Sequence, residues 1–505
     1  MIQFFTFCIP FLVFWPSSIL ALPVDPSTRG EFVQKKRGFE LPIRRRVVRS
    51  GSSLKRGTYS GSTGLGDSLD LFYTVAVTIG ETVTAVNVDT GSSDLWVVSS
   101  ACTTSVCEST NMPPYPSANI KPAGGSVNLL YGDSSTGTHA SGPVAQDTAT
   151  VAGLAIPQQP FAAISDTNNT SVMQGANGIF GLGFPSGSQI QTATINAKFN
   201  NSLTTDDFVL GTASDGPFLS RLAMSGALEQ PMFTVMLQRD AIDVSRNNGA
   251  LTIGKLPDGI DNSSLTWVPV RLYKSEDGGL SPPTFAPNEI YPFRWEVPLD
   301  GIVLDGQRLH ASKLTGSSPT LSALLDTGNS VIRGPRDVVD SVLKSVSSAF
   351  AANSNAAPTF PCKVPHTLAF QIGGKTFPVD PRDFMSQNKI GDVSTCVANN
   401  LVATDPPQSG ALFSWSLGDP FFKSNLVAFY YGNLTHPSVD PPRIGFLSMV
   451  PDNANVLLQN DIAQAEANGG NFESESVLSP VITDLVNLVM TNGVRPSQAR
   501  CRSHQ

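Results

Sequence analysis

Short runs that alternate between apolar and polar residues are the clearest pattern along this chain. Residues 72–80 alternate with the period of two that predicts a half-buried strand. Residues 85–89 and 323–326 are apolar runs that each end in an aspartate. Similar short runs, bounded by Gly and Pro, recur along the sequence. The pattern therefore predicts an all-β fold.

The two aspartates begin the same tripeptide, Asp-Thr-Gly, at 89–91 and at 326–328. A strand that runs into such a turn places a carboxylate where hydroxyls and backbone amides can hold it. One Asp before a Gly usually marks only a turn. Here, however, a second match lies 92 residues after each aspartate, at Gly181 and at Gly418. This equal spacing predicts two lobes built on one plan.

The paired motifs resemble those of the pepsin-family aspartic proteases of the secreted fungal kind, over about residues 68 to 450. The resemblance implies an all-β, bilobal fold with the active site in the cleft between two related lobes, 57–270 and 271–450. It implies that Asp89 and Asp326 form the catalytic pair. The residues that would support this pair are Thr90, Gly91, Ser92, Trp96, Thr327 and Gly328.

One position departs from the family pattern. The family usually has Thr or Ser after the second Asp-Thr-Gly, whereas this chain has Asn329. An amide can donate a hydrogen bond where the hydroxyl did, but with a different reach. The departure therefore bears on the pKa values of the pair and on the pH optimum.

Residues 131–137 form a turn-rich segment with an aromatic residue at its base, which alone predicts only a hairpin. The resemblance implies the flap that closes over bound peptide, with Tyr131, Gly132 and Asp133 at the substrate and Trp96 bracing Tyr131. Fungal relatives with Asp at the position of Asp133 accept Lys before the cleaved bond, besides large apolar residues. The alternative is a turn-forming Asp133 that points to solvent.

Two carboxyl groups that share one proton can hydrolyse a peptide bond without a covalent intermediate, because one takes a proton from water while the other protonates the carbonyl oxygen. The resemblance therefore implies an aspartic endopeptidase that acts on proteins or peptides at acidic pH without a cofactor. A non-catalytic relative that binds peptide or protein is the alternative. A glycosidase would need its two acids on different strands of one barrel rather than at equivalent points of a repeat.

The charge of the chain is unevenly distributed. Residues 22–56 hold ten Lys or Arg against three acidic residues, although the net charge of the whole chain is −8. Residues 1–21 are apolar and predict a secretory signal peptide, so the protein is expected outside the cell rather than in a vacuole or at the cell surface. The resemblance implies that 22–56 is a pro-segment that lies across the cleft as an inhibitor. Lys55-Arg56 is the preferred processing site, because an accessible polar run follows it.

Six Cys are present, one of them within the signal peptide. Cys102, Cys107, Cys362 and Cys396 allow three pairings, of which pairing within each lobe is the most economical. The resemblance implies the bridges Cys102–Cys107 and Cys362–Cys396, and it leaves Cys501 over.

Other features bear on partners and processing. The acidic net charge argues against nucleic acid as a partner, and the five His form no spaced cluster with Cys that would predict a metal site. We expect a monomer.

The tail 451–505 is unassigned; within it, 477–490 is too short for a bilayer span and predicts an amphipathic helix or a disordered extension. Glycosylation sequons occur at Asn168, Asn169, Asn200, Asn262 and Asn433.

Overall fold

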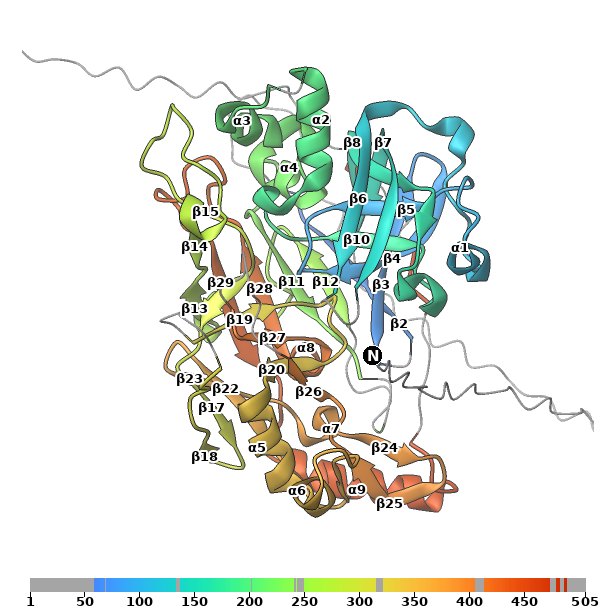
Figure 1. Ribbon diagram of the computed structural model, residues 1–505, viewed down its shortest axis with the longest axis vertical. Helices are drawn as coiled ribbons and strands as arrows, with labels where there is room; N and C mark the ends of the chain where they lie inside the picture. Colours follow the sequence, from blue (N-terminus) through green and yellow to red (C-terminus); the bar gives the residue numbers. More distant parts are fainter. Residues whose placement is uncertain are drawn as a thin grey trace, which may run out of the picture. The chain divides into compact units, whose positions relative to one another are not determined.

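A computed structural model (Figure 1) describes residues 59–472, except 69, 133–136, 201, 240–241, 243–248, 315–320 and 405–412, together with 478–481 and 486–487. The chain falls into two compact units, Met1–Leu54 and Lys55–Gln505, and every described residue belongs to the second. The expected signal peptide (1–21), pro-segment (22–56) and Cys501 lie outside the described residues.

The first half of the described chain builds a large sheet. Its strand order is β2-β3-β4-β10-β5-β8-β7-β6, and β9 and β30 pair at its margins with β7 and β8. The alternating run at 72–80 forms β3, as the sequence predicts. The bounds of these strands are β2 Gly66–Ser68, β3 Phe72–Ile79, β4 Thr82–Asp89, β5 Leu95–Val98, β6 Pro122–Tyr131, β7 Thr138–Val151, β8 Leu154–Ile164, β9 Asp166–Thr167, β10 Gly178–Gly181 and β30 Val486–Asn487.

The second half repeats the centre of that sheet. Strand β4 pairs in parallel with β10, which pairs antiparallel with β5, which pairs in parallel with β8. The series β19-β27-β20-β26 has the same order and the same directions, and β16 extends it. The prediction of an all-β fold with two related lobes is thereby confirmed. The bounds are β16 Glu296–Pro298, β19 Ser322–Leu325, β20 Ile332–Pro335, β26 Leu401–Thr404 and β27 Trp415–Leu417.

A six-stranded sheet draws on both halves of the sequence, in the order β1-β12-β11-β28-β29-β13. Its strands are β1 Gly61–Gly64, β11 Met232–Met236, β12 Ala250–Ile253, β13 Thr266–Pro269, β28 Asn425–Tyr430 and β29 Arg443–Ser448. The remaining strands form three small sheets: β14 Leu272–Tyr273 with β15 Tyr291–Pro292; β17 Gly301–Leu304, β18 Gln307–Arg308, β22 Leu368–Ile372 and β23 Lys375–Pro378; and β21 Thr359–Pro361, β24 Ser386–Lys389 and β25 Asp392–Val397.

The helices are short and cover the sheets. Helix α2 packs along β6, and α5 packs along β20 and β26 through a stripe of buried valines spaced for one helical face. The α-helices are α1 Ser105–Ser109, α2 Gln189–Lys198, α3 Thr205–Asp215, α4 Phe218–Ser225, α5 Arg336–Val346, α6 Ser348–Ala352, α7 Pro381–Phe384, α8 Asp419–Ser424 and α9 Ala454–Ala467; the 3₁₀ turns are η1 Ser117–Asn119, η2 Thr170–Gln174, η3 Pro185–Gly187, η4 Asn262–Ser264 and η5 Ser275–Asp277.

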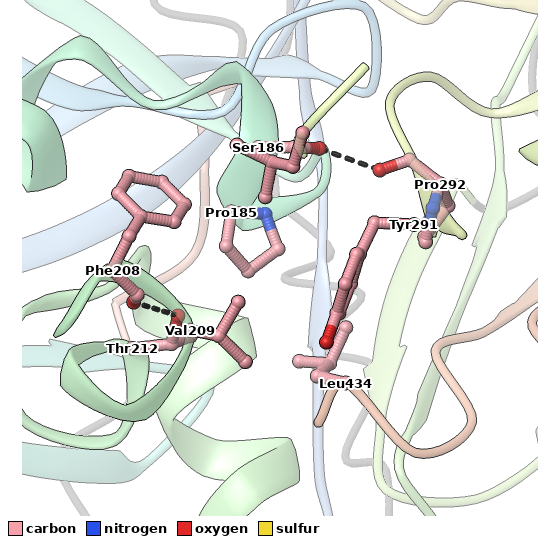
Figure 2. Close-up of a pocket in the computed structure, with 9 residues that line it drawn as sticks. Pro185, Ser186, Phe208, Val209, Thr212, Tyr291, Pro292 and Leu434 are labelled. Atoms are coloured by element: carbon pink, nitrogen blue, oxygen red, sulfur yellow. Dashed lines mark hydrogen bonds between the residues drawn. The ribbon is translucent and has the colours of Figure 1, made fainter. Parts of the chain in front are cut away.

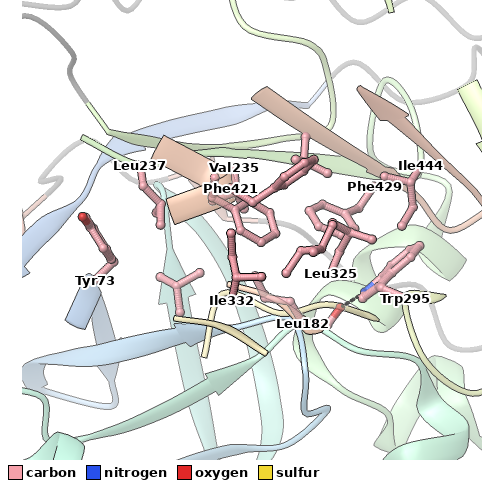
Figure 3. Packing of buried hydrophobic residues seen from close by; sticks show 14 of the residues in the cluster. Tyr73, Leu182, Val235, Leu237, Trp295, Leu325, Ile332, Phe421, Phe429 and Ile444 are labelled. Carbon is pink, nitrogen blue, oxygen red and sulfur yellow. Dashed lines mark hydrogen bonds between the residues drawn. The ribbon is translucent and has the colours of Figure 1, made fainter. Parts of the chain in front are cut away.

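An aromatic cluster lies within the main hydrophobic core, and Trp295, Phe421 and Phe429 are among its members shown in Figure 3. Phe233 and Phe429 stack with ring centroids 4.7 Å apart, and Trp295 packs edge-on against Phe429 at 5.1 Å. The indole N–H of Trp295 and the hydroxyl of Tyr431 both donate to the carbonyl oxygen of Leu182, at 2.9 and 2.7 Å. The N–H of Leu182 in turn donates to the backbone oxygen of Asp89. The core therefore holds the backbone of the first aspartate in place.

The tail belongs to the folded unit over part of its length. Helix α9 buries Leu458 and Ile462 in the main core. Further on, Ser479 hydrogen-bonds the side chain of Thr74 at 2.6 Å, and β30 pairs in parallel with the start of β8. The prediction of a helix or disordered extension over 477–490 is therefore wrong at Val486–Asn487. There the tail pairs with a part of β8 that β5 does not reach, which periodicity over a short apolar run cannot reveal.

Candidate active site

Two hydroxyls tie the two Asp-Thr-Gly loops together. The Thr90 hydroxyl donates to the backbone oxygen of Leu325, and the Thr327 hydroxyl donates to that of Val88, both at 2.7 Å. Each of these hydroxyls also accepts from the other threonine's backbone N–H, at 3.0 and 3.1 Å. Both threonines are buried. This reciprocal set of four bonds fixes the loops at the ends of β4 and β19 against each other.

The carboxyl groups of Asp89 and Asp326 meet between these loops and hydrogen-bond each other. The Asp89 carboxyl accepts from the N–H groups of Gly91 and Ser92 at 2.8 and 3.2 Å and from the Ser92 hydroxyl at 2.5 Å. The Asp326 carboxyl accepts from the Gly328 N–H at 3.0 Å. The sequence-predicted pair is thus brought together.

The two glycines leave room for the pair. A Cβ at Gly91 would lie 2.4 Å from a carboxylate oxygen of Asp326, and one at Gly328 would lie 2.5 Å from a carboxylate oxygen of Asp89. Real Cβ atoms do not approach oxygen this closely. Glycine at both positions therefore lets each carboxyl group reach across to the other loop.

The hydrogen bonds to the two carboxyls are not symmetric. Ser92 donates its hydroxyl to Asp89, but the amide of Asn329 donates to Ser416 at 2.9 Å. The Asn329 carbonyl oxygen accepts from Val331 and Arg333. Within the described residues, no side-chain bond links Asn329 to Asp326. The amide therefore does not replace the family's hydroxyl, and among the described residues Asp326 has no hydroxyl donor like the one that Ser92 gives Asp89, so only the Gly328 N–H favours its charged form by a hydrogen bond.

Burial dominates the protonation of the pair. It raises the pKa of Asp89, and the hydrogen bonds from Ser92 and Gly91 oppose this rise. Burial, followed by the charge of Asp89, raises the pKa of Asp326 to about 7, against the Gly328 N–H and the positive charge of Arg294. The carboxyls titrate as a pair that holds one proton over the intervening pH range.

Tyr131 lies at the end of β6, where the expected hairpin begins. The indole N–H of Trp96 donates to the Tyr131 hydroxyl at 2.8 Å, and their ring centroids lie 6.4 Å apart. Burial, followed by the charges of Asp94 and Asp89, raises the pKa of the Tyr131 hydroxyl well above its ordinary value. Gly132 follows with φ of 79°, and Asp133 lies outside the described residues.

Two residues near the pair were missed at the sequence level. Asp94 is buried and accepts from the Ser188 hydroxyl and from two N–H groups at the start of α2; its burial raises its pKa to about 6. The position of Asp94, five residues after Asp89 in the first motif, could have marked it as a residue near the site. Arg294 is the cation beside Asp326, and no local motif marks it.

The remaining predicted sites are placed as follows. The structure contains the bridges Cys102–Cys107 and Cys362–Cys396. Within the described residues there is no group of three or more His, Cys, Asp or Glu that could hold a metal ion. Among the sequons, Asn169 is buried and Asn433 partly buried, whereas the exposed ones are Asn168, Asn200 and Asn262.

Comparison with known proteins agrees with this geometry. The family model described as eukaryotic aspartyl protease matches residues 72–436, so the chain belongs to that family. The major aspartyl peptidase 1 of Cryptococcus neoformans is 25% identical over 82% of this chain and 77% of the relative. An aspartic protease of Phaffia rhodozyma is 25% identical over 85% of this chain and 89% of the relative. An embryonic pepsinogen of Gallus gallus is 28% identical over 71% of this chain and 77% of the relative. The predicted pepsin-family membership is confirmed. The protein is an aspartic-type endopeptidase, a hydrolase of peptide bonds.

Proposed function

We propose that Asp89 and Asp326 are the catalytic pair and that the enzyme cleaves peptide bonds in proteins at acidic pH. The observation that carries this proposal is the mutual hydrogen bond of the two buried carboxyls, held by the reciprocal bonds of Thr90 and Thr327. Two carboxyls about 3 Å apart cannot both ionise readily, so the pair keeps one proton.

The pair then supplies both proton transfers of hydrolysis. The ionised carboxyl takes a proton from a water molecule, which attacks the peptide carbonyl carbon. The protonated carboxyl donates its proton to the carbonyl oxygen, which gives a tetrahedral gem-diol while the pair still holds the proton taken from water. That proton then passes to the leaving nitrogen as the C–N bond breaks, and the other carboxyl takes a proton from a gem-diol hydroxyl, so the pair again holds one proton. Each proton transfer of this kind contributes about 10²- to 10⁴-fold to the rate. Tyr131, held by Trp96, would cover the substrate and exclude water from the site.

Digestion of an acid-denatured protein by the correctly processed chain tests this proposal. We expect cleavage between about pH 3 and pH 6, and we expect a statine-type inhibitor to abolish it, because such an inhibitor occupies the position of the attacked carbonyl between the carboxyls. Absence of cleavage would favour a protein that binds peptide without cutting it. Cleavage that resists the inhibitor would point to another catalytic centre.

We further propose that the enzyme prefers large apolar residues before the cleaved bond and that Asp133 adds acceptance of Lys. A carboxylate that faces the pocket would pair with the Lys ammonium group. In matched peptides with Phe or Lys at this position, Asp133→Ser should weaken cleavage after Lys about tenfold more than cleavage after Phe. An unchanged Lys-to-Phe ratio would show that Asp133 only shapes the turn.

Processing and destination are proposals that rest on the sequence. We propose that residues 1–21 direct secretion and that 22–56 inhibits the zymogen until acid weakens its attraction to the acidic body. We propose a monomer glycosylated at the exposed sequons Asn168, Asn200 and Asn262. N-terminal sequencing, glycosidase treatment and size-exclusion chromatography of the secreted protein test these points. A mature N-terminus upstream of Lys55 would contradict the processing site. Within the described residues, no helix has the length and apolarity required to cross a membrane.

A further inference from the structure

The register of one strand pair places a cation opposite the second aspartate. Strands β16 and β19 are antiparallel, with Glu296 opposite Leu324, and the N–H of Leu325 donates to the backbone oxygen of Trp295 at 3.0 Å. Continued by one residue pair beyond Trp295 and Leu325, the same register places Arg294 opposite Asp326. Its charge acts on the Asp326 carboxyl, although no ion pair joins them within the described residues.

The segment that carries Arg294 is anchored on both sides. On one side, the hydroxyl of Ser186 in η3 donates to the backbone oxygen of Pro292 at 2.5 Å (Figure 2). The Tyr291 hydroxyl donates to the backbone oxygen of Thr435 at 3.0 Å. On the other side, Trp295 is fully buried in the aromatic cluster. Arg294 therefore projects from a backbone that is fixed in relation to the pair.

Arg294 differs from the other arginines of the interior because, in the part of the chain that the structure describes, its side chain forms no hydrogen bond or ion pair. Its guanidinium carbon lies 4.9 Å from the ring centroid of Phe293 and 5.9 Å from that of Phe413. Its Nε is buried without a hydrogen bond, and the described residues offer it no carboxylate within ion-pair distance. By contrast, Arg239 pairs with Asp383 at 2.6 Å. A guanidinium carries five N–H donors, and its strongest hydrogen bonds are those with an anion such as a carboxylate.

We propose that Arg294 is a specificity-determining residue that binds the carboxylate of an Asp or Glu side chain of the substrate, next to the cleaved bond on the Asp326 side. This inference rests on the proposed function of the Asp89–Asp326 pair. Arginine carries a planar, charged guanidinium whose fork of N–H donors matches a carboxylate. Among the described residues, the charge of Arg294 acts on the carboxyl of Asp326, and its guanidinium lies by the rings of Phe293 and Phe413. An acidic substrate side chain would complete its hydrogen bonds.

Matched peptides that differ only by Glu or Gln at one position test this proposal. The position is scanned over the residues that flank the cleaved bond. At about pH 5.5, where Glu is ionised, we expect the wild-type enzyme to prefer one Glu peptide about tenfold in kcat/KM. At about pH 3 the preference should disappear, because the Glu side chain is protonated. Arg294→Gln should lose the preference at pH 5.5, and Arg294→Lys should keep part of it.

The control is Arg443→Gln, because Arg443 also packs on aromatic rings but already pairs with Asp440 at 3.0 Å. This variant should keep the wild-type Glu-to-Gln ratio. Equal ratios in the wild type and in Arg294→Gln would overturn the inference while cleavage of the Gln peptide still supports the catalytic pair. If the wild type cleaves neither peptide of any pair, the proposed function fails and the inference fails with it.

A second readout separates electrostatic action from packing. Because the charge of Arg294 lowers the pKa of Asp326, its removal in Arg294→Gln should shift the basic limb of the kcat/KM profile to higher pH. Arg294→Lys retains the charge and should shift that limb less. Identical limbs in the wild type and in Arg294→Gln would show that Arg294 does not act on the pair.

Discussion

Asp89→Asn and Asp326→Asn are each expected to lower kcat about 10³- to 10⁴-fold, because an amide can neither accept the proton from water nor carry the shared proton. The measurement is the cleavage rate of a saturating peptide by the processed variants. Asp258→Asn, which removes an exposed carboxylate that pairs with Lys255, should retain full activity.

The fold should survive both active-site substitutions. Burial raises the pKa of both carboxyls, so their ionisation near neutral pH disfavours the folded state, and a neutral amide removes that cost. Melting temperatures at pH 7 should therefore be unchanged or higher. If either variant retains activity within tenfold of the wild type, the pair is not the catalytic centre.

Asp383→Asn is expected to lower the free energy of unfolding by about 3–5 kcal/mol, because it leaves a buried guanidinium without its main counterion. Asp383 accepts from Nε and an Nη of Arg239 at 2.7 and 2.6 Å and from the Ser424 hydroxyl at 2.7 Å. The side chains of Arg239 and Asp383 are 8% and 0% exposed. Asp380, at 3.7 Å from Arg239, compensates only in part.

Denaturant unfolding measures this effect, and the Asp89→Asn background prevents self-digestion of the unfolded chain. Burial raises the pKa of Asp383, but the charge and hydrogen bonds of Arg239 outweigh it together with the charge of Lys423 and the Ser424 hydroxyl, so the pKa lies below the ordinary value. Stability from this pair is therefore complete above the ordinary aspartate pKa and is lost as the pH falls through the lowered value. At about pH 5 the pair is intact. Asp258→Asn should change stability little, and a loss below about 1 kcal/mol in Asp383→Asn would contradict the argument.

The features of the fold that depend on local sequence could be predicted. Alternation predicted β3, and the duplicated Asp-Thr-Gly turns with their equally spaced glycines predicted both the repeat and the approach of Asp89 to Asp326. These features could be predicted because each depends on a run of adjacent residues or on a repeat.

The features that could not be predicted depend on pairings between segments far apart in the sequence. The amide of Asn329 donates to Ser416, which no spacing in the sequence reveals. Arg294 lies near Asp326 because of the register in which β16 pairs with β19. The six-stranded sheet joins strands from both ends of the chain, and the tail strand β30 uses backbone groups of β8. All four of these features depend on tertiary contacts between distant segments rather than on local sequence.

The pH dependence of kcat/KM for an uncharged peptide tests the central claim most directly, which is that Asp89 and Asp326 work while holding one proton between them. The account predicts a bell-shaped profile. Activity falls at low pH, where both carboxyls are protonated, and falls again near neutral pH as the proton leaves, since the pKa of Asp326 is raised to about 7. A profile that keeps rising to about pH 8 would contradict the account, because the pair would then be fully ionised.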